Sequence, residues 1–128
     1  MGMNYFGVGI AVKNNIEAVA LYQKVFGLEL GFVDHFPEGD PRHGKYYMHA
    51  VLLKDGKELF SVASIDPDAE IEKQHGFGVR FDNEDEVRKA FALLSEGGVI
   101  KNPLGSVSWS PYCGDVIDKY GVSWWISV

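Results

Sequence analysis

The chain has 128 residues, of which 46% are hydrophobic, with one cysteine and a formal charge of −6. This length allows one domain with a substantial core, and a single cysteine excludes an intramolecular disulfide. The acidic balance argues against nucleic acid, because binding to phosphates needs a basic surface. No apolar run approaches the ~20 residues of a membrane helix, and the start lacks the basic region of a signal peptide. We therefore expect a cytoplasmic protein without nucleic-acid or membrane partners.

The first half begins with an apolar strand, GVGIAV, which starts at Gly7 and leads into NNIEAVALYQKVFG. Apolar residues recur there with helical period; Asn14 or Asn15 can cap the start and Gly27 can end the helix. Three strands are predicted to follow, over residues 28–36, 46–54 and 55–62. The loop PEGDPRHG, at 37–44, is rich in turn residues, and we expect it to be mobile.

The second half repeats this order from Gly76. GFGVRF predicts a strand, and NEDEVRKAFALLSEGG predicts a helix with Asn83 and Glu86 as a capping box. The acidic run at 82–86 fits capping and dipole compensation better than a cation site. Three strands are again predicted, over residues 99–109, 111–117 and 120–127. The Gly-x-Gly pairs lie within strands, so they favour close backbone approach over phosphate binding.

The two halves therefore form an internal repeat. The segments that start at Gly7 and Gly76 share alternating glycines and apolar residues followed by Asn and Glu. Each half reads strand, helix, strand, strand, strand, which predicts an α+β fold. We expect a single domain, 1–128, made of modules 1–66 and 75–128 and a linker at 67–74. The four-stranded sheet of each module has only one helix, so its other face must line a cavity or meet another sheet.

Several motifs resemble the vicinal oxygen chelate superfamily, also called glyoxalase/bleomycin resistance/dioxygenase. AVALYQKVFGLEL is similar to its first helix and turn, and DVIDKYGVSWWIS is similar to its closing motif. HAVLLKDGKELF looks most like the PhnB-like branch. The resemblance implies two βαβββ modules whose curved mixed sheets surround a cleft, usually in a homodimer. Many members hold a divalent metal there with four His or Glu ligands, for isomerase, dioxygenase or epoxide-opening chemistry, whereas others bind antibiotics without a metal.

The positions that match these ligands lack donors. Counting from the helix-opening Asn gives Gly7 and Gly76, and counting from the turn glycine gives Phe60 and Trp125. None of the four can hold a metal, so we expect no metal and no other cofactor. If the first and last strands face each other across the cleft, the two aromatics extend into the space left by the glycines. Since neighbouring side chains on a strand point to opposite faces, Trp124 is then in the core.

Other residues are weaker candidates. Trp109 is a second aromatic for stacking against a flat ligand. His49 can face the cleft and hydrogen-bond a ligand, or lie half-exposed beside a partner chain. His75 is one residue away from a ligand position, and a one-residue shift reverses the face of a strand, so it is more typical of a strand edge. Cys113 has no activating neighbour in sequence, which favours a buried structural thiol.

Three loop residues complete the set of candidates, namely His35, Arg42 and His43, which either close over a ligand or are simply exposed. The sequence thus favours a non-metal protein that binds a small organic molecule, aromatic or cationic, in an aromatic cleft of a homodimer. The alternative is a lyase, isomerase or dioxygenase with ligands relocated to His49, His75 or Glu58, or with metal-free acid–base chemistry. A third possibility is a module whose main role is dimer assembly or protein interaction.

Overall fold

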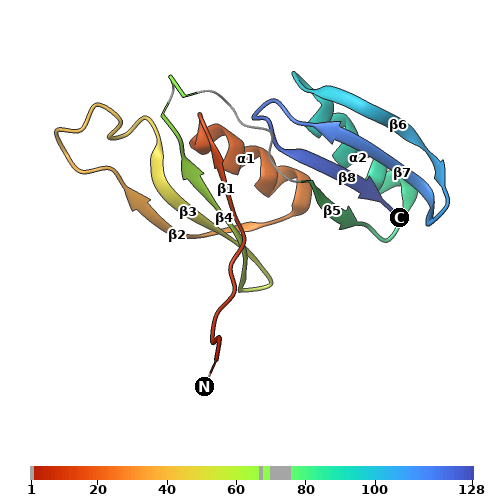
Figure 1. Ribbon diagram of the computed structural model, residues 1–128, viewed down its shortest axis with the longest axis horizontal. Helices are drawn as coiled ribbons and strands as arrows, with labels where there is room; N and C mark the ends of the chain where they lie inside the picture. The colour runs from red at the N-terminus through yellow and green to blue at the C-terminus, as the bar shows by residue number, and fades with distance from the viewer. Residues whose placement is uncertain (1, 67, 70–75) are drawn as a thin grey trace. The chain divides into compact units, whose positions relative to one another are not determined.

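The structure, a computed structural model, describes residues 2–66, 68–69 and 76–128 (Figure 1). The chain divides into two compact units, Met1–Ala69 and Glu70–Val128. Most of the linker predicted at 67–74 lies outside the described residues, and so does His75. Within the described part of the chain, no helix combines the length and the hydropathy that crossing a bilayer requires.

The first unit is a four-stranded mixed sheet with one helix. Its strand order is β1-β4-β3-β2, in which β1 pairs with β4 in parallel and the other pairs are antiparallel. In chain order the elements are β1 (Gly9–Val12), α1 (Asn15–Phe26), β2 (Glu29–His35), β3 (Tyr47–Lys54) and β4 (Lys57–Ser64).

The second unit has the same topology, with strand order β5-β8-β7-β6 and a parallel pair β5 and β8. Its elements are β5 (Phe77–Arg80), α2 (Glu84–Ser95), β6 (Val99–Val107), β7 (Ser110–Ile117) and β8 (Ser123–Ser127). The α+β fold with two βαβββ modules is confirmed. A cleft shared between the modules stays a prediction.

The ends of both helices follow from local sequence. The side chain of Asn14, and not that of Asn15, caps α1 by accepting a hydrogen bond from the backbone N–H of Glu17 at 3.3 Å. Gly27 ends this helix in the left-handed conformation, with φ of 67°, where a side chain would be strained. In the second unit Asn83 caps α2 by accepting from the backbone N–H of Glu86 at 2.9 Å.

Asn15 instead ties α1 to the sheet. It is fully buried, its amide donates to the carbonyl of Tyr47 at 2.7 Å, and its carbonyl accepts from the backbone N–H of Tyr47 at 2.9 Å. A buried amide that satisfies both backbone groups of one strand residue fixes where the helix starts relative to β3.

Each helix packs on one face of its sheet and builds a core there. In the first unit these core residues are Ile10, Val12, Ala18, Val19, Tyr22, Ala50, Leu52, Phe60 and Val62. In the second they are Val87, Ala90, Phe91, Leu94, Val116, Trp124 and Ile126. We call the opposite side of each sheet its helix-free face, and the candidate site residues are described relative to it.

Candidate functional site

A row of four residues crosses the helix-free face of the second sheet. Gly78 on β5 pairs with Trp125 on β8, Trp125 pairs with Asp115 on β7, and Asp115 pairs with Asn102 on β6. Because directly paired residues point to the same face, these side chains lie side by side. Sequence analysis predicted Trp125 here but missed Gly78, Asp115 and Asn102, because the pairing of strands depends on turn lengths and bulges.

The indole of Trp125 lies over Gly76 and Gly78. A Cβ atom added at Gly78 would be 2.6 Å from Cζ2 of Trp125 and well inside contact with Nε1 and Cε2. A Cβ added at Gly76 would be 3.3 Å from Cζ3. The ring therefore occupies space that is free only because residues 76 and 78 are glycines. The sequence suggested this, since aromatic residues were expected to extend into space left by glycines. The strands that carry these residues are neighbours in one sheet, whereas we expected them to face each other across a cleft.

Trp124 points the other way, into the core under α2. It is 4% exposed, against 41% for Trp125. Its Nε1 donates to the carboxylate of Asp118 at 2.9 Å, and the same carboxylate accepts from the backbone N–H of Tyr120 at 2.9 Å and of Val122 at 3.1 Å. This buried cluster fixes the turn before β8 and, with it, the direction in which Trp125 points.

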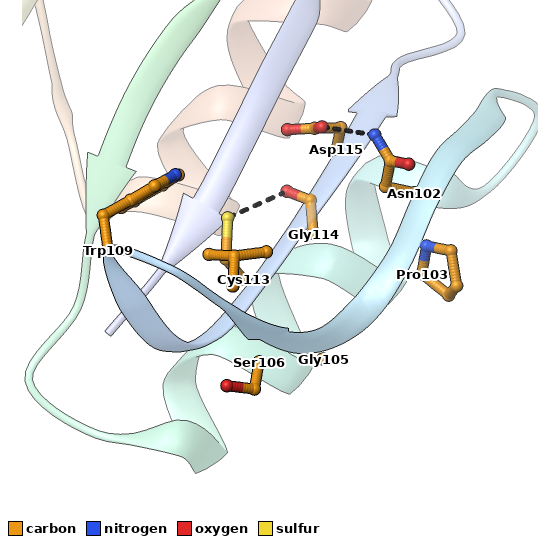
Figure 2. Close-up of a pocket in the computed structure, with 9 residues that line it drawn as sticks. Asn102, Pro103, Gly105, Ser106, Trp109, Cys113, Gly114 and Asp115 are labelled. Atoms are coloured by element: carbon orange, nitrogen blue, oxygen red, sulfur yellow. Dashed lines mark hydrogen bonds between the residues drawn. The ribbon is translucent and has the colours of Figure 1, made fainter.

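A hollow of about 360 Å³ opens beside this row, between β6, β7 and the turn that joins them (Figure 2). At one side the amide of Asn102 donates to the carboxylate of Asp115 at 2.6 Å. Trp109, 52% exposed, comes from the turn. In Figure 2 the Trp109 indole and the Asp115–Asn102 pair flank Cys113. The hollow is lined by Asn102, Pro103, Gly105, Ser106, Val107, Trp109, Cys113, Gly114 and Asp115.

Cys113 lies at the floor of the hollow as a buried thiol, 4% exposed. Its Sγ donates weakly to the carbonyl of Gly114 at 4.0 Å. Burial, and then the negative charge of Asp115, raise the pKa of the Cys113 thiol. Because the thiolate is the reactive form, this environment favours the structural role expected from the sequence.

The first module places Phe60 differently from our expectation. Gly9 pairs with Ser61 as Gly78 pairs with Trp125, so Ser61, and not Phe60, corresponds to Trp125. Phe60 is 8% exposed and meets the ring of Tyr22 edge-on, with 6.0 Å between centroids, on the face that α1 covers. The expectation that Phe60 faces the cleft is therefore corrected, and Phe60 is the counterpart of Trp124.

The one-residue difference comes from a bulge in β4. Two residues after their turn glycines, Glu58 pairs with Leu53 and Ser123 pairs with Ile117. The pairing of β4 then skips Leu59, because Phe60 pairs with Leu52, whereas β8 continues along β7 without a shift. Counting four residues from the turn glycine therefore gives opposite faces in the two modules, because the extra residue reverses the alternation of faces.

Gly7 precedes β1 and is exposed, and the ring of Tyr5 folds over it. The Tyr5 hydroxyl donates to the carboxylate of Glu58, and this hydrogen bond raises the pKa of Tyr5. Glu58 is thereby engaged by a neighbouring hydroxyl. His49 pairs with Asp34 across β2 and β3 on the helix-free face of the first sheet.

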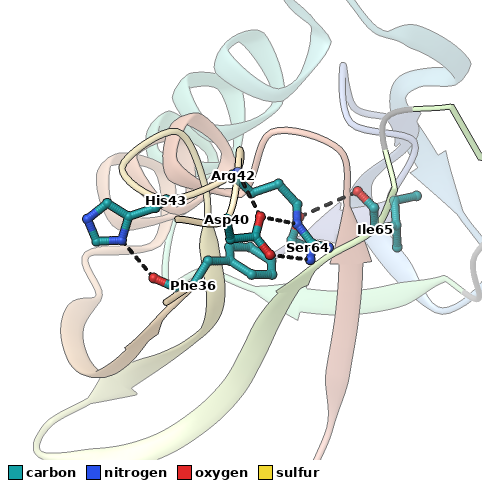
Figure 3. Close-up of polar contacts among 6 residues, drawn as sticks. All are labelled: Phe36, Asp40, Arg42, His43, Ser64 and Ile65. Carbon is teal, nitrogen blue, oxygen red and sulfur yellow. Dashed lines mark hydrogen bonds and ion pairs between the residues drawn. The ribbon is translucent and has the colours of Figure 1, made fainter. Parts of the chain in front are cut away.

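The loop between β2 and β3 is held by its own side chains (Figure 3). Arg42 forms an ion pair with Asp40 at 2.8 Å, and its guanidinium lies 4.0 Å from the centroid of the Phe36 ring. His43 Nδ1 lies 2.7 Å from the carbonyl oxygen of Phe36, so Nδ1 carries the proton. These contacts pack the loop onto Phe36, and its mobility stays a prediction. His35 meets the ring of Tyr47 edge-on at 5.9 Å.

The residues at the expected ligand positions do not fit a divalent metal. Glycine and tryptophan offer no donor atom, and Ser61 would add one hydroxyl, whereas such ions take His, Cys or carboxylate ligands. Among the described residues, no three His, Cys, Asp or Glu side chains lie close enough together to hold an ion.

Comparison with known proteins agrees with the fold. The Glyoxalase/Bleomycin resistance protein/Dioxygenase superfamily matches residues 3–126, so the chain belongs to this superfamily. A putative 3-demethylubiquinone-9 3-methyltransferase, PhnB protein, from Bacillus cereus is 25% identical, with 97% of this chain and 98% of that chain covered and a TM-score of 0.82. The structural neighbours thus include a PhnB-like protein. A search of curated proteins finds no match.

Two further solved structures share the fold. A protein from Pseudomonas aeruginosa is 24% identical, with 98% of this chain and 97% of that chain covered and a TM-score of 0.77. The fosfomycin resistance protein FosX from Listeria monocytogenes, solved with Mn(II) and sulfate, is 13% identical. The match covers 100% of this chain and 91% of the FosX chain, with a TM-score of 0.66. These identities support the fold alone.

Proposed function

We propose that this protein binds a small organic ligand, aromatic or cationic, on the helix-free face of its second module, without the metal common in the superfamily. The observation that carries this proposal is the exposed Trp125 indole, which covers Gly76 and Gly78. The resemblance to the superfamily implies a metal ligand at this position, and tryptophan supplies none. An exposed indole on a rigid strand offers a flat apolar surface for stacking.

The remaining candidates take supporting roles in this proposal. Trp109 offers a second aromatic surface, and Gly76 leaves room for the ligand and the Trp125 ring. His49, on the helix-free face of the first module, would donate or accept a hydrogen bond if that face meets the ligand in the assembled protein. Gly7 would take part there together with the Tyr5 ring that folds over it.

Thermal unfolding with a panel of aromatic and cationic compounds tests the proposal. A ligand at one hundred times its Kd adds ~2.7 kcal/mol to folding stability, which raises Tm by several degrees. We expect Trp125→Ala to lose this rise and Phe32→Ala to retain it, since Phe32 is an even more exposed aromatic in the other module, at 68% against 41% for Trp125. A stoichiometric rise with Zn²⁺, Ni²⁺, Mn²⁺ or Fe²⁺ instead would contradict the proposal.

The second candidate function is an enzyme of the lyase, isomerase or dioxygenase type. The pairing of His49 with Asp34 favours it, because a carboxylate beside an imidazole is a common arrangement for a general base. Turnover that persists in His49→Ala would remove this residue from the mechanism. A loss of turnover with unchanged Tm would support the enzyme.

We further propose that the protein works as a homodimer in the cytoplasm, with modules 1–66 and 75–128 contributing to one domain. The superfamily membership supports the dimer. Light scattering after size exclusion measures the mass directly. A mass of one chain at micromolar concentration would contradict the dimer.

A further inference from the structure

The hollow beside β6 and β7 has a polar side made of hydrogen-bond acceptors. Asn102 Nδ2 donates to one carboxylate oxygen of Asp115 at 2.6 Å. Because a carboxylate only accepts, the NH₂ of Asn102 must face Asp115, and its carbonyl oxygen is turned elsewhere. Asp115 therefore brings a negative charge, and since one N–H of Asn102 is already used, the pair offers more hydrogen-bond acceptors than donors to an incoming group.

The charge of the hollow is not neutralised from within. Of the described residues that line it, none is lysine, arginine or histidine. The remaining polar side chains are Ser106 and the Cys113 thiol, and the latter is turned to the carbonyl of Gly114. The chain as a whole carries a charge of −6. A cation is thus favoured over an anion at this place both locally and at long range.

The other side of the hollow is apolar and aromatic. The Trp109 indole is 52% exposed and Val107 is 41% exposed, and both line the hollow. An indole face attracts a cation and also stacks on a flat group. The hollow, at about 360 Å³, is at the small end of ligand pockets, so it suits one ring or one short head group.

A metal ion fits this chemistry poorly. One carboxylate and one amide carbonyl give two oxygen ligands, whereas Ca²⁺ takes six to eight and Mg²⁺ also prefers an octahedral set. A nitrogen cation needs only one or two acceptors and an adjoining flat surface. Asp115 is next to Trp125 across the strands, so the remainder of a larger molecule would extend over the Trp125 indole.

We infer that the hollow binds the cationic head group of an organic ligand, namely an amidinium, guanidinium or primary ammonium joined to a flat or apolar portion. Asp115 pairs with the charge, Asn102 holds the carboxylate in place, and Trp109 covers the apolar portion. This inference rests on the proposed function, since the hollow and Trp125 belong to the same face of the same sheet.

A series of isosteric probes tests the charge. Benzamidine, benzamide and benzoate have nearly the same shape and differ in being cationic, neutral and anionic. Each is titrated into the full-length protein while the indole N–H signals of the three tryptophans are followed by proton–nitrogen NMR. Trp109→Phe assigns the Trp109 signal. We expect benzamidine to shift that signal saturably and the other two probes to bind at least about tenfold more weakly.

Two matched variants locate the effect. Asp115→Asn removes the charge but keeps the shape and an acceptor for Asn102, and we expect it to weaken benzamidine about tenfold without changing the weak binding of benzamide. Glu29→Gln removes an exposed carboxylate from the other module and should change nothing. The probe comparison in the unaltered protein remains decisive even if Asp115→Asn folds poorly.

The outcomes separate this inference from the proposed function. Equal binding of all three probes at Trp109 or Trp125 would overturn the cation preference and leave the aromatic site standing. A benzamidine shift confined to Trp125 and unaffected by Asp115→Asn would also overturn it. If no probe shifts any indole signal, both the inference and the proposed ligand site are wrong.

Discussion

Replacing Gly78 by alanine tests the geometry on which the proposed site depends. The new methyl group would be 2.6 Å from Cζ2 of Trp125 and inside contact with two further ring atoms. Gly78 is not in the left-handed region, so the backbone itself accepts alanine. The ring must therefore move. Since Trp125 is 41% exposed, it can turn outward, and we place the packing loss near the low end of the usual range, about 1–2 kcal/mol.

An opposing effect reduces this loss. Glycine to alanine at a compatible position stabilises by about 0.4–1 kcal/mol, because the unfolded chain has less freedom to lose. The net expectation for Gly78→Ala is a loss of about 1 kcal/mol, or roughly 3–5 °C in Tm for a domain of this size. Gly105→Ala is the matched control: it is in the same sheet, has no atom within 4 Å of the added Cβ, and should be neutral or stabilising.

A double-mutant cycle isolates the contact. If the Trp125 ring causes the loss, Gly78→Ala should be neutral or stabilising in a Trp125→Ala background, with an interaction energy of about 1 kcal/mol. Thermal unfolding followed by circular dichroism gives the four stabilities, and tryptophan emission reports the displaced ring. A Gly78→Ala protein as stable as Gly105→Ala, with an unchanged emission spectrum, would refute the placement of Trp125 over β5.

Three further predictions concern the packing around the site. Asn15→Ala should lower the free energy of unfolding by about 1–3 kcal/mol in urea titrations, because it leaves the partly buried backbone N–H and carbonyl of Tyr47 without their side-chain partner. The hydrogen bonds from Arg42 lower the pKa of Asp40 from 3.8 to about 2, so the stability they add is present above the unfolded value and lost as pH falls toward 2. The Tm difference between the wild type and Asp40→Asn should therefore shrink between about pH 4 and pH 2, and a constant difference would contradict the ion pair. A thiol reagent should modify Cys113 far more slowly in the native protein than in urea, since the thiol is buried and its pKa is raised; equal rates would show that the hollow exposes it.

Local signals in the sequence were sufficient to predict the two modules. Asn83 and the residues after it specify a cap and an amphipathic stripe within a few positions, and the structure has both. The repeat between Gly7 and Gly76 indicated that the two halves share one topology, which the matching strand orders confirm. These features depend on neighbours in sequence, so propensity and periodicity report them directly.

The faces of strands were harder to predict because they depend on bulges. Phe60 and Trp125 both lie four residues after a turn glycine, yet the pairing of β4 with β3 skips Leu59, whereas β8 pairs with β7 without a shift. That extra residue in β4 moves Phe60 to the helix side. The partners of Trp125 also depend on pairing between β7, β6 and their bulges, which no local pattern in SPYCGDVI reveals.

The adjacent tryptophans link the core to the proposed site. Trp124 is held by Asp118, whose carboxylate also accepts from two backbone N–H groups of the turn before β8. Because consecutive side chains on a strand point to opposite faces, fixing Trp124 inward also fixes Trp125 outward. A flat indole that stacks on a ligand gains most when its rotamers are already restricted, since less conformational entropy is lost on binding. Gly78 limits the ring on one side and the buried Asp118 cluster sets the strand beneath it. The Trp125 surface is therefore preorganised by a hydrogen-bonded core that the ligand never needs to touch.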